Sequence, residues 1–462
     1  MKKRIIVCCD GTWNQPEKLE HTQIVATNVL KMLRAVSPKD EKRGIAQVLY
    51  YHSGVGTGNL GVADKVFGGL LGAGISKNIQ DCYRFIANNY SEGDELFLFG
   101  FSRGAYTVRS LSAMIHCVGI LNKTDLRHVP HAYEYYHTEP ENRSHATYEE
   151  MHTPPIETIK GKDVPIKYVG VWDTIGSLGI PTPILGRLQR KLGRKFPRFN
   201  VGFHNEEMLP TVENAFQALA LDERRGPFKP SIWKYAREDQ RVEQVWFSGV
   251  HRNIGGGALN SGLSDCALAW MIDRARECGL VFDHQYLENN IEADKFAEEE
   301  NSYSQGYKVL EKFGVKPYQR EIGYAEEGRR YLHAGEMIHP FVISRINKNE
   351  NYAPPVLMGD GGVLEFADEG NREAVVINDL NVPVYIMRPI RLSTNVEATI
   401  TTTTQLPVVG KLVNYSRTGA CLEGAPQLAI GTTLQFTSKP TGKKRGEVVW
   451  LNNNKVGIKY AA

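Results

Sequence analysis

The stretch "GDELFLFGFSRGAYTVRS", from Gly93 to Ser110, joins an apolar run to a helical pattern through one serine between two glycines. The run Glu95–Phe101 is almost entirely apolar, which predicts a buried strand. After Ser102 the apolar positions recur every three or four residues, which is one face of a helix. These positions are Ala105, Val108, Leu111, Ile115 and Val118. The stretch therefore predicts a strand, a sharp turn at Ser102 and a helix.

Similar apolar runs occur before and after this stretch and predict further strands. They are KRIIVCC (3–9), AQVLYYH (46–52), IKYVGVW (166–172) and VEQVWFSGV (242–250). Helical patterns lie between them, near Asn28–Val36 and from Ile75 onward. Near-continuous apolar strands separated by helices are typical of a mostly parallel sheet with helices on both faces. We therefore expect an α/β fold of the α/β-hydrolase type.

The residues Gly100-Phe101-Ser102-Arg103-Gly104 form a G-x-S-x-G pattern between the predicted strand and helix. In an α/β-hydrolase this turn exposes a nucleophilic serine above the sheet, and the glycines allow close backbone packing. Amides at the start of the helix face the oxyanion that forms during acyl transfer. We expect Ser102 to be the nucleophile, with oxyanion donors at Arg103 and at Gly11 or Thr12. The alternative is that Ser102 only caps the helix.

A serine nucleophile needs a histidine base and an acidic residue that orients it. In this fold the chain order is serine, acid, histidine, and sites form at the carboxyl ends of the strands. Asp173 and His251 each follow an apolar run in that order. We expect them to complete a triad. The alternatives are a turn aspartate at a strand end and an ordinary surface or core histidine.

Several longer segments resemble a known family of α/β-hydrolases, the one that contains the type VI secretion phospholipase effectors. The segments are CCDGTWN, TNVLKM, YHSGVGT, GFSRGAYTVRSL, VGVWDTIGSLG, ALALDERR, WFSGVHRNIGGG, LSDCALAWM and IHPFVISRI with YAPP, spread over about residues 3–357. The resemblance implies a serine hydrolase of ester bonds, with phospholipids as substrates and Ser102, Asp173 and His251 as the triad. It departs at Ser248, where such motifs usually have Pro, and at Arg252-Asn253, where they have Ser-Asp.

Composition sets further bounds on the chain. Its 462 residues suffice for more than one domain, and 42% hydrophobic with 23% charged residues is typical of a globular protein. The seven cysteines show neither paired nor metal-binding spacing, which favours a reducing compartment without a metal site. The first apolar run is too short for a signal peptide, and no run is long enough to span a membrane. We expect a cytoplasmic protein that needs no cofactor for catalysis and binds no nucleic acid.

The segment Gly54–Ser76 is rich in glycine and apolar residues and is expected to be a long loop. Its apolar residues are Val62, Val66, Phe67, Leu70 and Leu71. A mobile apolar segment beside a catalytic site can act as a lid or make transient contact with a membrane surface. The alternative is a buried connector.

The character of the sequence changes after about residue 357. We expect a hydrolase domain at 1–357, a linker at 358–386 that includes "GDGG", and a small β-barrel at 387–462 made of short, Thr- and Val-rich strands. From Arg388 to the end there are ten Lys and Arg and three Glu, a net charge of +7, whereas the rest of the chain carries −4. This basic tail indicates an anionic partner or simply a solvated basic surface.

The tail resembles the PilZ domain, a small barrel that binds cyclic di-GMP. The resemblance rests on the motif Asn414-x-Ser416-x-x-Gly419 and on two upstream arginines. The implied ligand residues are Arg388, Arg391, Asn414, Ser416, Arg417 and Gly419. Arginine suits such a ligand because it can pair with phosphate and fork onto guanine. The family spaces its arginines with three intervening residues and this chain with two, so a degenerate PilZ domain used for protein contacts stays open.

Taken together, the patterns predict a serine hydrolase, and the two resemblances imply an esterase or phospholipase that cyclic di-GMP regulates, with activation more expected than inhibition. The alternatives are a catalytically silent cyclic-dinucleotide receptor on a hydrolase scaffold, a PilZ-bearing interaction protein with a hydrolase fold, and an exported toxin.

Overall fold

The computed structural model describes residues 2–11, 19–20, 23–54, 69–138, 164–176, 207–302, 317–349, 351–358, 366–368, 371–386, 392–402, 407–415, 419–424, 428–438, 441–452 and 455–460. The chain divides into two compact units, Met1–Tyr385 and Ile386–Ala462, which we treat separately. Within the described part of the chain, no helix is long and apolar enough to cross a membrane.

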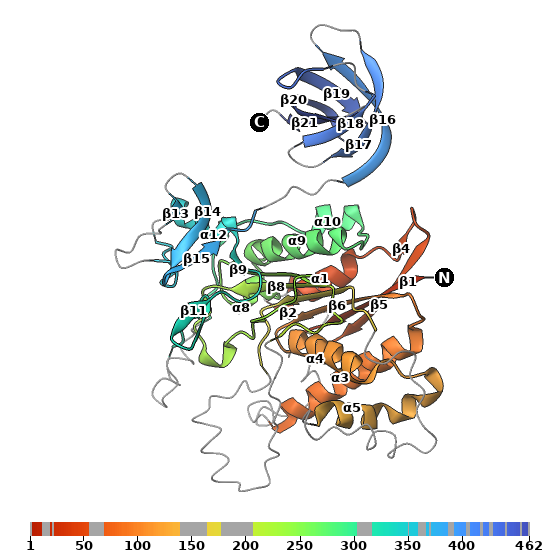
Figure 1. Ribbon diagram of the computed structural model, residues 1–462, viewed down its shortest axis with the longest axis vertical. Coiled ribbons are helices and arrows are strands. Elements are labelled where there is room, and N and C mark those ends of the chain that lie inside the picture. The colour runs from red at the N-terminus through yellow and green to blue at the C-terminus, as the bar shows by residue number, and fades with distance from the viewer. Residues whose placement is uncertain are drawn as a thin grey trace. The chain divides into compact units, whose positions relative to one another are not determined.

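The first unit is built on an eight-stranded sheet with the strand order β12-β9-β8-β7-β6-β1-β5-β4 (Figure 1). In that order the strands are Glu336–Ile338, Arg241–Phe247, Asn214–Ala220, Tyr168–Trp172, Glu95–Phe101, Lys3–Cys9, Ile45–His52 and Lys39–Asp40. All neighbouring pairs are parallel except β4 and β5. The expected mostly parallel sheet is confirmed, and it brings the carboxyl ends of β1, β6, β7, β8 and β9 to one edge.

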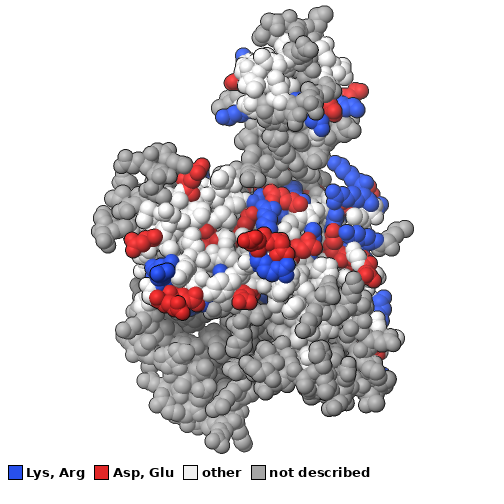
Figure 2. Space-filling view, viewed as in Figure 1, with Lys and Arg blue, Asp and Glu red and all other residues white. Residues whose placement is uncertain are grey.

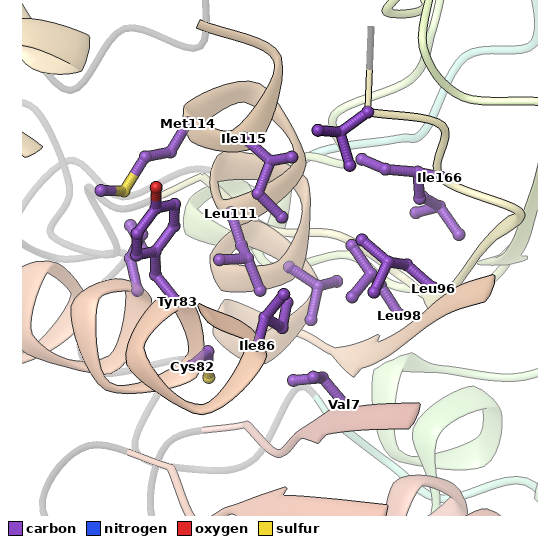
Figure 3. Close-up of a cluster of buried hydrophobic side chains, with 14 of the residues drawn as sticks. Val7, Cys82, Tyr83, Ile86, Leu96, Leu98, Leu111, Met114, Ile115 and Ile166 are labelled. Carbon is purple, nitrogen blue, oxygen red and sulfur yellow. The ribbon is translucent and has the colours of Figure 1, made fainter. Parts of the chain in front are cut away.

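Helices cover both faces of this sheet because its central strands are apolar on both sides. Alternate residues of β1 point to opposite faces: Ile5 and Val7 join one core cluster, whereas Ile6 and Cys8 join the other. The first face packs on α3 (Gly69–Asn89) and α4 (Arg103–Val118) (Figure 3). It also packs on α5 (Val129–His137). The second packs on α1 (Asn28–Ala35), α9 (Gly262–Glu277) and α10 (His284–Asn290).

The periodicity after Ser102 describes α4 correctly, since its predicted apolar positions are all buried. The helix before β6 is longer than expected. It begins at Gly69, inside the segment read as a loop, because a helical pattern can continue through glycine when tertiary packing supports it. The expected loop residues 55–68 lie outside the described residues.

The segment 358–386, expected to be a linker, contains a three-stranded antiparallel sheet of β13 (Phe366–Asp368), β14 (Asn371–Ile377) and β15 (Leu380–Pro383). Val375, Ile377 and Val382 are buried in a cluster that includes Trp246 of β9. The Tyr385 amide then donates to the Ile338 carbonyl at 2.8 Å. The linker prediction rested on the glycines of GDGG and overlooked the alternating apolar residues of β14, Val375 and Ile377, which pack against the rest of the unit. This sheet belongs to the first unit.

The first unit also contains smaller described elements. Two hairpins are formed by β2 (Leu19–Glu20) with β3 (Gln23–Ile24), and by β10 (Tyr324–Glu326) with β11 (Arg329–Tyr331). The helices α8 (His251–Gly255) and α12 (Pro340–Lys348) follow β9 and β12 directly.

The second unit is a closed six-stranded barrel with the order β16-β17-β18-β21-β20-β19. The strands in chain order are Leu392–Thr402, Val408–Tyr415, Gly419–Glu423, Thr433–Ser438, Gly442–Asn452 and Lys455–Tyr460. Its core is aliphatic with one phenylalanine, Phe436, and includes Ile400, Leu412, Leu422 and Val448. The expected small C-terminal β-barrel is confirmed.

Candidate active site

Ser102 lies at the turn between β6 and α4 in an unusual backbone conformation. Its φ is 58° and its ψ is −121°, a region that residues with a Cβ rarely adopt. The serine occupies the N-cap position, yet its side chain makes no capping hydrogen bond. The helix-capping alternative therefore loses its physical basis. A strained serine at the end of a central strand is the geometry that exposes a nucleophile.

The two glycines of the pattern are required by close backbone contacts. A Cβ on Gly104 would lie 2.1 Å from the carbonyl oxygen of Cys9, at the end of β1. A Cβ on Gly100 would lie 2.5 Å from the carbonyl oxygen of Gly104 itself. The turn can therefore be this tight, and this close to β1, only with glycine at both positions.

Asp173 and His251 meet at the same edge of the sheet. Asp173 follows β7, the neighbour of β6, and also has a positive φ, of 44°. His251 is the first residue of α8, which follows β9. The Nδ1 atom of His251 is 2.5 Å from Oδ2 of Asp173, and both residues are buried. The other ring nitrogen, Nε2, is the one that a triad uses as its base.

Two aromatic rings and the Asp173 carboxylate influence the pKa of His251. The ring lies 4.6 Å from the ring of Phe101 and 5.0 Å from that of Phe228, measured between centroids. This burial lowers the pKa of His251 below its usual value, although the bond to Asp173 opposes the shift. An unprotonated imidazole is the form that can accept a proton from serine.

Arg320 makes the second set of contacts to Asp173. Its Nη1 is 2.5 Å from Oδ1 and its Nη2 is 2.9 Å from Oδ2, while the Ala220 amide also donates to Oδ1 at 3.1 Å. Burial opposes ionisation of this carboxyl, but Arg320 and the His251 bond outweigh it and hold the pKa of Asp173 well below its usual range. Sequence reasoning missed Arg320, which lies in "PYQREIG" with no motif around it.

The expected oxyanion donors are only partly described. The Gly11 amide donates to Oδ1 of Asp10 at 2.7 Å, and Oδ2 of Asp10 accepts from Thr27 and Tyr51 at 2.5 and 2.9 Å. Arg103 is the first residue of α4, so its amide is one of the amides at the start of that helix. Thr12 lies outside the described residues.

The expected cyclic di-GMP residues fall mostly outside the described residues, namely Arg388, Arg391, Ser416 and Arg417. Asn414 lies in β17, where its backbone pairs with Cys421. Gly419 begins β18, and a Cβ there would lie 2.2 Å from the Ile458 carbonyl oxygen. Strand packing alone is therefore sufficient reason for this glycine.

Of the expected lid residues, Val62, Val66 and Phe67 also lie outside the described residues. Leu70 and Leu71 are in the first turn of α3. Among the described residues, no group of three or more His, Cys, Asp or Glu is arranged to hold a metal ion.

A parallel sheet with helices on both faces and a strained serine between strand and helix is the architecture of the α/β-hydrolases. Within that class, the chain belongs to the family of catalytic domains of Tle1-like phospholipase effectors of type VI secretion, whose model matches residues 3–274. The match ends well before residue 357, and therefore before Arg320.

The match to an individual relative has low sequence identity. An uncharacterized protein of Saccharomyces cerevisiae is 28% identical over an alignment of 247 residues, and the match covers 49% of this chain and 32% of the yeast protein. This chain thus spans about a third of that relative's length.

Solved structures resemble the chain at low identity. An uncharacterized protein from Pseudomonas aeruginosa is 14% identical, with 64% of this chain and 49% of that chain covered and a TM-score of 0.37. A butyrate-bound thermophilic esterase from Thermogutta terrifontis is 12% identical, with 60% and 84% covered and a TM-score of 0.30. The PilZ domain of CeSA from a cellulose-synthesizing bacterium is 13% identical, with 16% and 81% covered and a TM-score of 0.15.

Proposed function

We propose that the first unit is a serine-dependent ester hydrolase whose substrates are membrane phospholipids, acting in the cytoplasm at the membrane surface. The observation that supports this most is the 2.5 Å contact between His251 Nδ1 and Asp173 Oδ2, at the sheet edge where Ser102 holds its strained turn. Membership of the phospholipase effector family supports the lipid substrate.

The proposed reaction follows from these positions. Ser102 Oγ attacks the acyl carbonyl, and Nε2 of His251 accepts the hydroxyl proton. Asp173 holds the proton on Nδ1 and thereby fixes the tautomer. The Ser102–acyl ester forms as the alcohol leaves with the proton from His251, and water then hydrolyses the ester with His251 again as the base. None of these steps needs a metal or an organic cofactor.

Amides must stabilise the oxyanion of the tetrahedral intermediate. We assign this role to the amide of Arg103 and to one amide from Gly11 or Thr12. Because the Gly11 amide donates to Asp10 Oδ1 at 2.7 Å, it can take part only if it leaves that carboxylate.

Covalent labelling tests the serine assignment. A fluorophosphonate probe should label the wild-type protein and fail to label Ser102→Ala. Ser112→Ala is the matched control, because Ser112 lies on the same helix and its buried hydroxyl donates to the Arg109 carbonyl at 2.7 Å. Unchanged labelling of Ser102→Ala would refute the proposal. A complete lack of labelling in the wild type, together with no ester hydrolysis, would favour a catalytically silent scaffold.

For the barrel we propose a PilZ-like domain that binds cyclic di-GMP and thereby regulates hydrolysis. The closed six-stranded barrel, its net positive charge and the Asn414/Ser416/Gly419 motif support this assignment. The ligand set also includes Arg388, Arg391 and Arg417. Calorimetric titration of cyclic di-GMP into the intact protein tests binding, and no heat at high micromolar ligand would leave a barrel used for protein contacts.

A further inference from the structure

Arg320 contacts the acid of the candidate triad more extensively than His251 does. Its guanidinium binds both carboxylate oxygens of Asp173, and the same two nitrogens donate to the carbonyls of Ala220 at 2.8 Å and Phe228 at 2.7 Å. The side chain of Arg320 is only 1% exposed. The planar guanidinium is held by four acceptors, two carboxylate oxygens and two carbonyl oxygens, so its orientation is fixed. It therefore fixes the orientation of the Asp173 carboxylate as well.

This contact also changes the charge that His251 experiences. In a triad the unpaired negative charge of the acid stabilises the imidazolium that forms when the base takes the serine proton. Here a guanidinium of opposite charge is bonded to that acid in a buried site, where charge interactions are weakly screened. The Asp173–Arg320 pair therefore presents little net charge to the imidazole.

Several other described charged groups near His251 have partners as well. Glu223 accepts the His251 amide at 3.2 Å and is itself bound by Arg225 at 2.8 Å. On α8, Arg252 pairs with Glu300 at 3.4 Å. Asp222, beside the turn that leads into α8, accepts from the Gly249 amide at 2.6 Å and the Tyr352 hydroxyl at 2.8 Å. Among the described residues, Glu223 thus has a cation of its own, and Asp222 has two donors.

We propose that Arg320 is a positioning residue of the candidate triad: it fixes the Asp173 carboxylate and offsets its charge, so that His251 remains an unprotonated base in weakly acidic solution. The inference rests on the proposed function, but it concerns a residue outside the matched family segment 3–274. Burial of the ring acts in the same direction, since it lowers the pKa of His251.

The test is the pH dependence of kcat/KM on a soluble short-chain ester, measured for the intact protein. The base must be unprotonated, so kcat/KM rises with pH through the pKa of the Asp173–His251 pair. In Arg320→Met the unopposed carboxylate should favour the protonated imidazole. We expect the acidic limb of the profile to move to higher pH by about one unit or more.

Two further variants separate the effect of the Arg320 charge from a general loss of structure. Arg320→Lys keeps the charge but not the fork, so the acidic limb should stay near its wild-type position while kcat falls by roughly tenfold. Arg4→Met is the matched control, because Arg4 is equally buried and pairs with Asp40 and Glu95 at 3.1 Å, away from Asp173. It should lower stability and leave the acidic limb unchanged.

The outcomes distinguish this inference from the proposed function. If the wild type hydrolyses esters and Arg320→Met keeps the wild-type acidic limb, the inference is overturned and the hydrolase stands. If Ser102→Ala hydrolyses as fast as wild type, the proposed function fails. The His251 ring can then still be titrated by NMR with and without Arg320→Met, and an unchanged pKa there would overturn the inference as well.

Discussion

Ser102 holds its backbone where a side chain is unfavourable, and this strain is what exposes the hydroxyl. The φ of 58° with ψ of −121° belongs to a region that glycine enters without a steric penalty. Ser102 therefore destabilises the fold at the position where the proposed chemistry needs it, as functional residues often do.

The first prediction follows from that strain. Ser102→Gly should raise the free energy of unfolding by about 1 kcal/mol or more while abolishing hydrolysis, because glycine removes the Cβ conflict and the hydroxyl together. Ser102→Ala is the control, since alanine removes the hydroxyl and keeps the Cβ. Chemical denaturation of the three proteins measures the difference. Equal stability of the glycine and alanine variants would contradict the strain argument.

The second prediction concerns the triad as a unit. Ser102→Ala, Asp173→Asn and His251→Ala should each lower kcat/KM by several orders of magnitude, because the three side chains act in one proton transfer. The triple variant should be little worse than Ser102→Ala alone. Steady-state kinetics on a short-chain ester gives these values, with circular dichroism as the check on folding. Near-wild-type turnover in His251→Ala would place the base elsewhere.

At the scale of elements, the site depends on how closely α4 approaches β1. Gly104 is the contact point, because any side chain there would meet the Cys9 carbonyl. The end of β1 carries Asp10 and Gly11, so the same contact sets the distance between the nucleophile turn and the expected oxyanion loop.

Gly104→Ala tests this contact. The new methyl group should force the turn away from β1, lower the free energy of unfolding by roughly 1–3 kcal/mol and reduce kcat/KM strongly. Gly93→Ala is the matched control, since Gly93 precedes β6 with a φ of 88° and open space around its Cα. The control should lose about 1 kcal/mol through backbone strain but retain its activity. Full activity in Gly104→Ala would show that the contact does not position Ser102.

At the scale of the whole molecule, charge is divided unevenly between the two units. On the face of the first unit drawn in Figure 2, the described acidic and basic side chains are interspersed. The C-terminal segment from Arg388 onward instead carries a net charge of +7. An anionic ligand would be attracted to the second unit by this charge.

The regulatory prediction belongs to this scale. Cyclic di-GMP should raise ester hydrolysis by about 5- to 150-fold, which corresponds to a coupling of roughly 1–3 kcal/mol between ligand binding and the active arrangement. Activation is expected because an unregulated lipase in the cytoplasm would damage the membrane of its own cell. Arg391→Ala should lose the response, whereas Arg445→Ala, an exposed arginine on β20, should keep it. Rates that do not change with ligand would refute the regulatory model.

The sequence by itself determined most of the first unit's architecture and its candidate reacting groups. Near-continuous apolar runs predicted the parallel strands β1, β5, β6, β7 and β9, and the three-to-four spacing predicted α4. These patterns are local, because the order of apolar and polar residues within a short segment determines them. The order of Ser102, Asp173 and His251 at strand ends followed from the same patterns.

Only the tertiary structure decided which side chains meet. Arg320 reaches Asp173 across 147 residues of chain from a segment without periodicity or motif. The strands β13–β15 likewise could be recognised only from the structure, where Val375 and Val382 are buried against residues distant in the sequence. Such contacts depend on how separate elements pack, and a charged side chain in an irregular segment gives no local sign that its partner is a buried carboxylate.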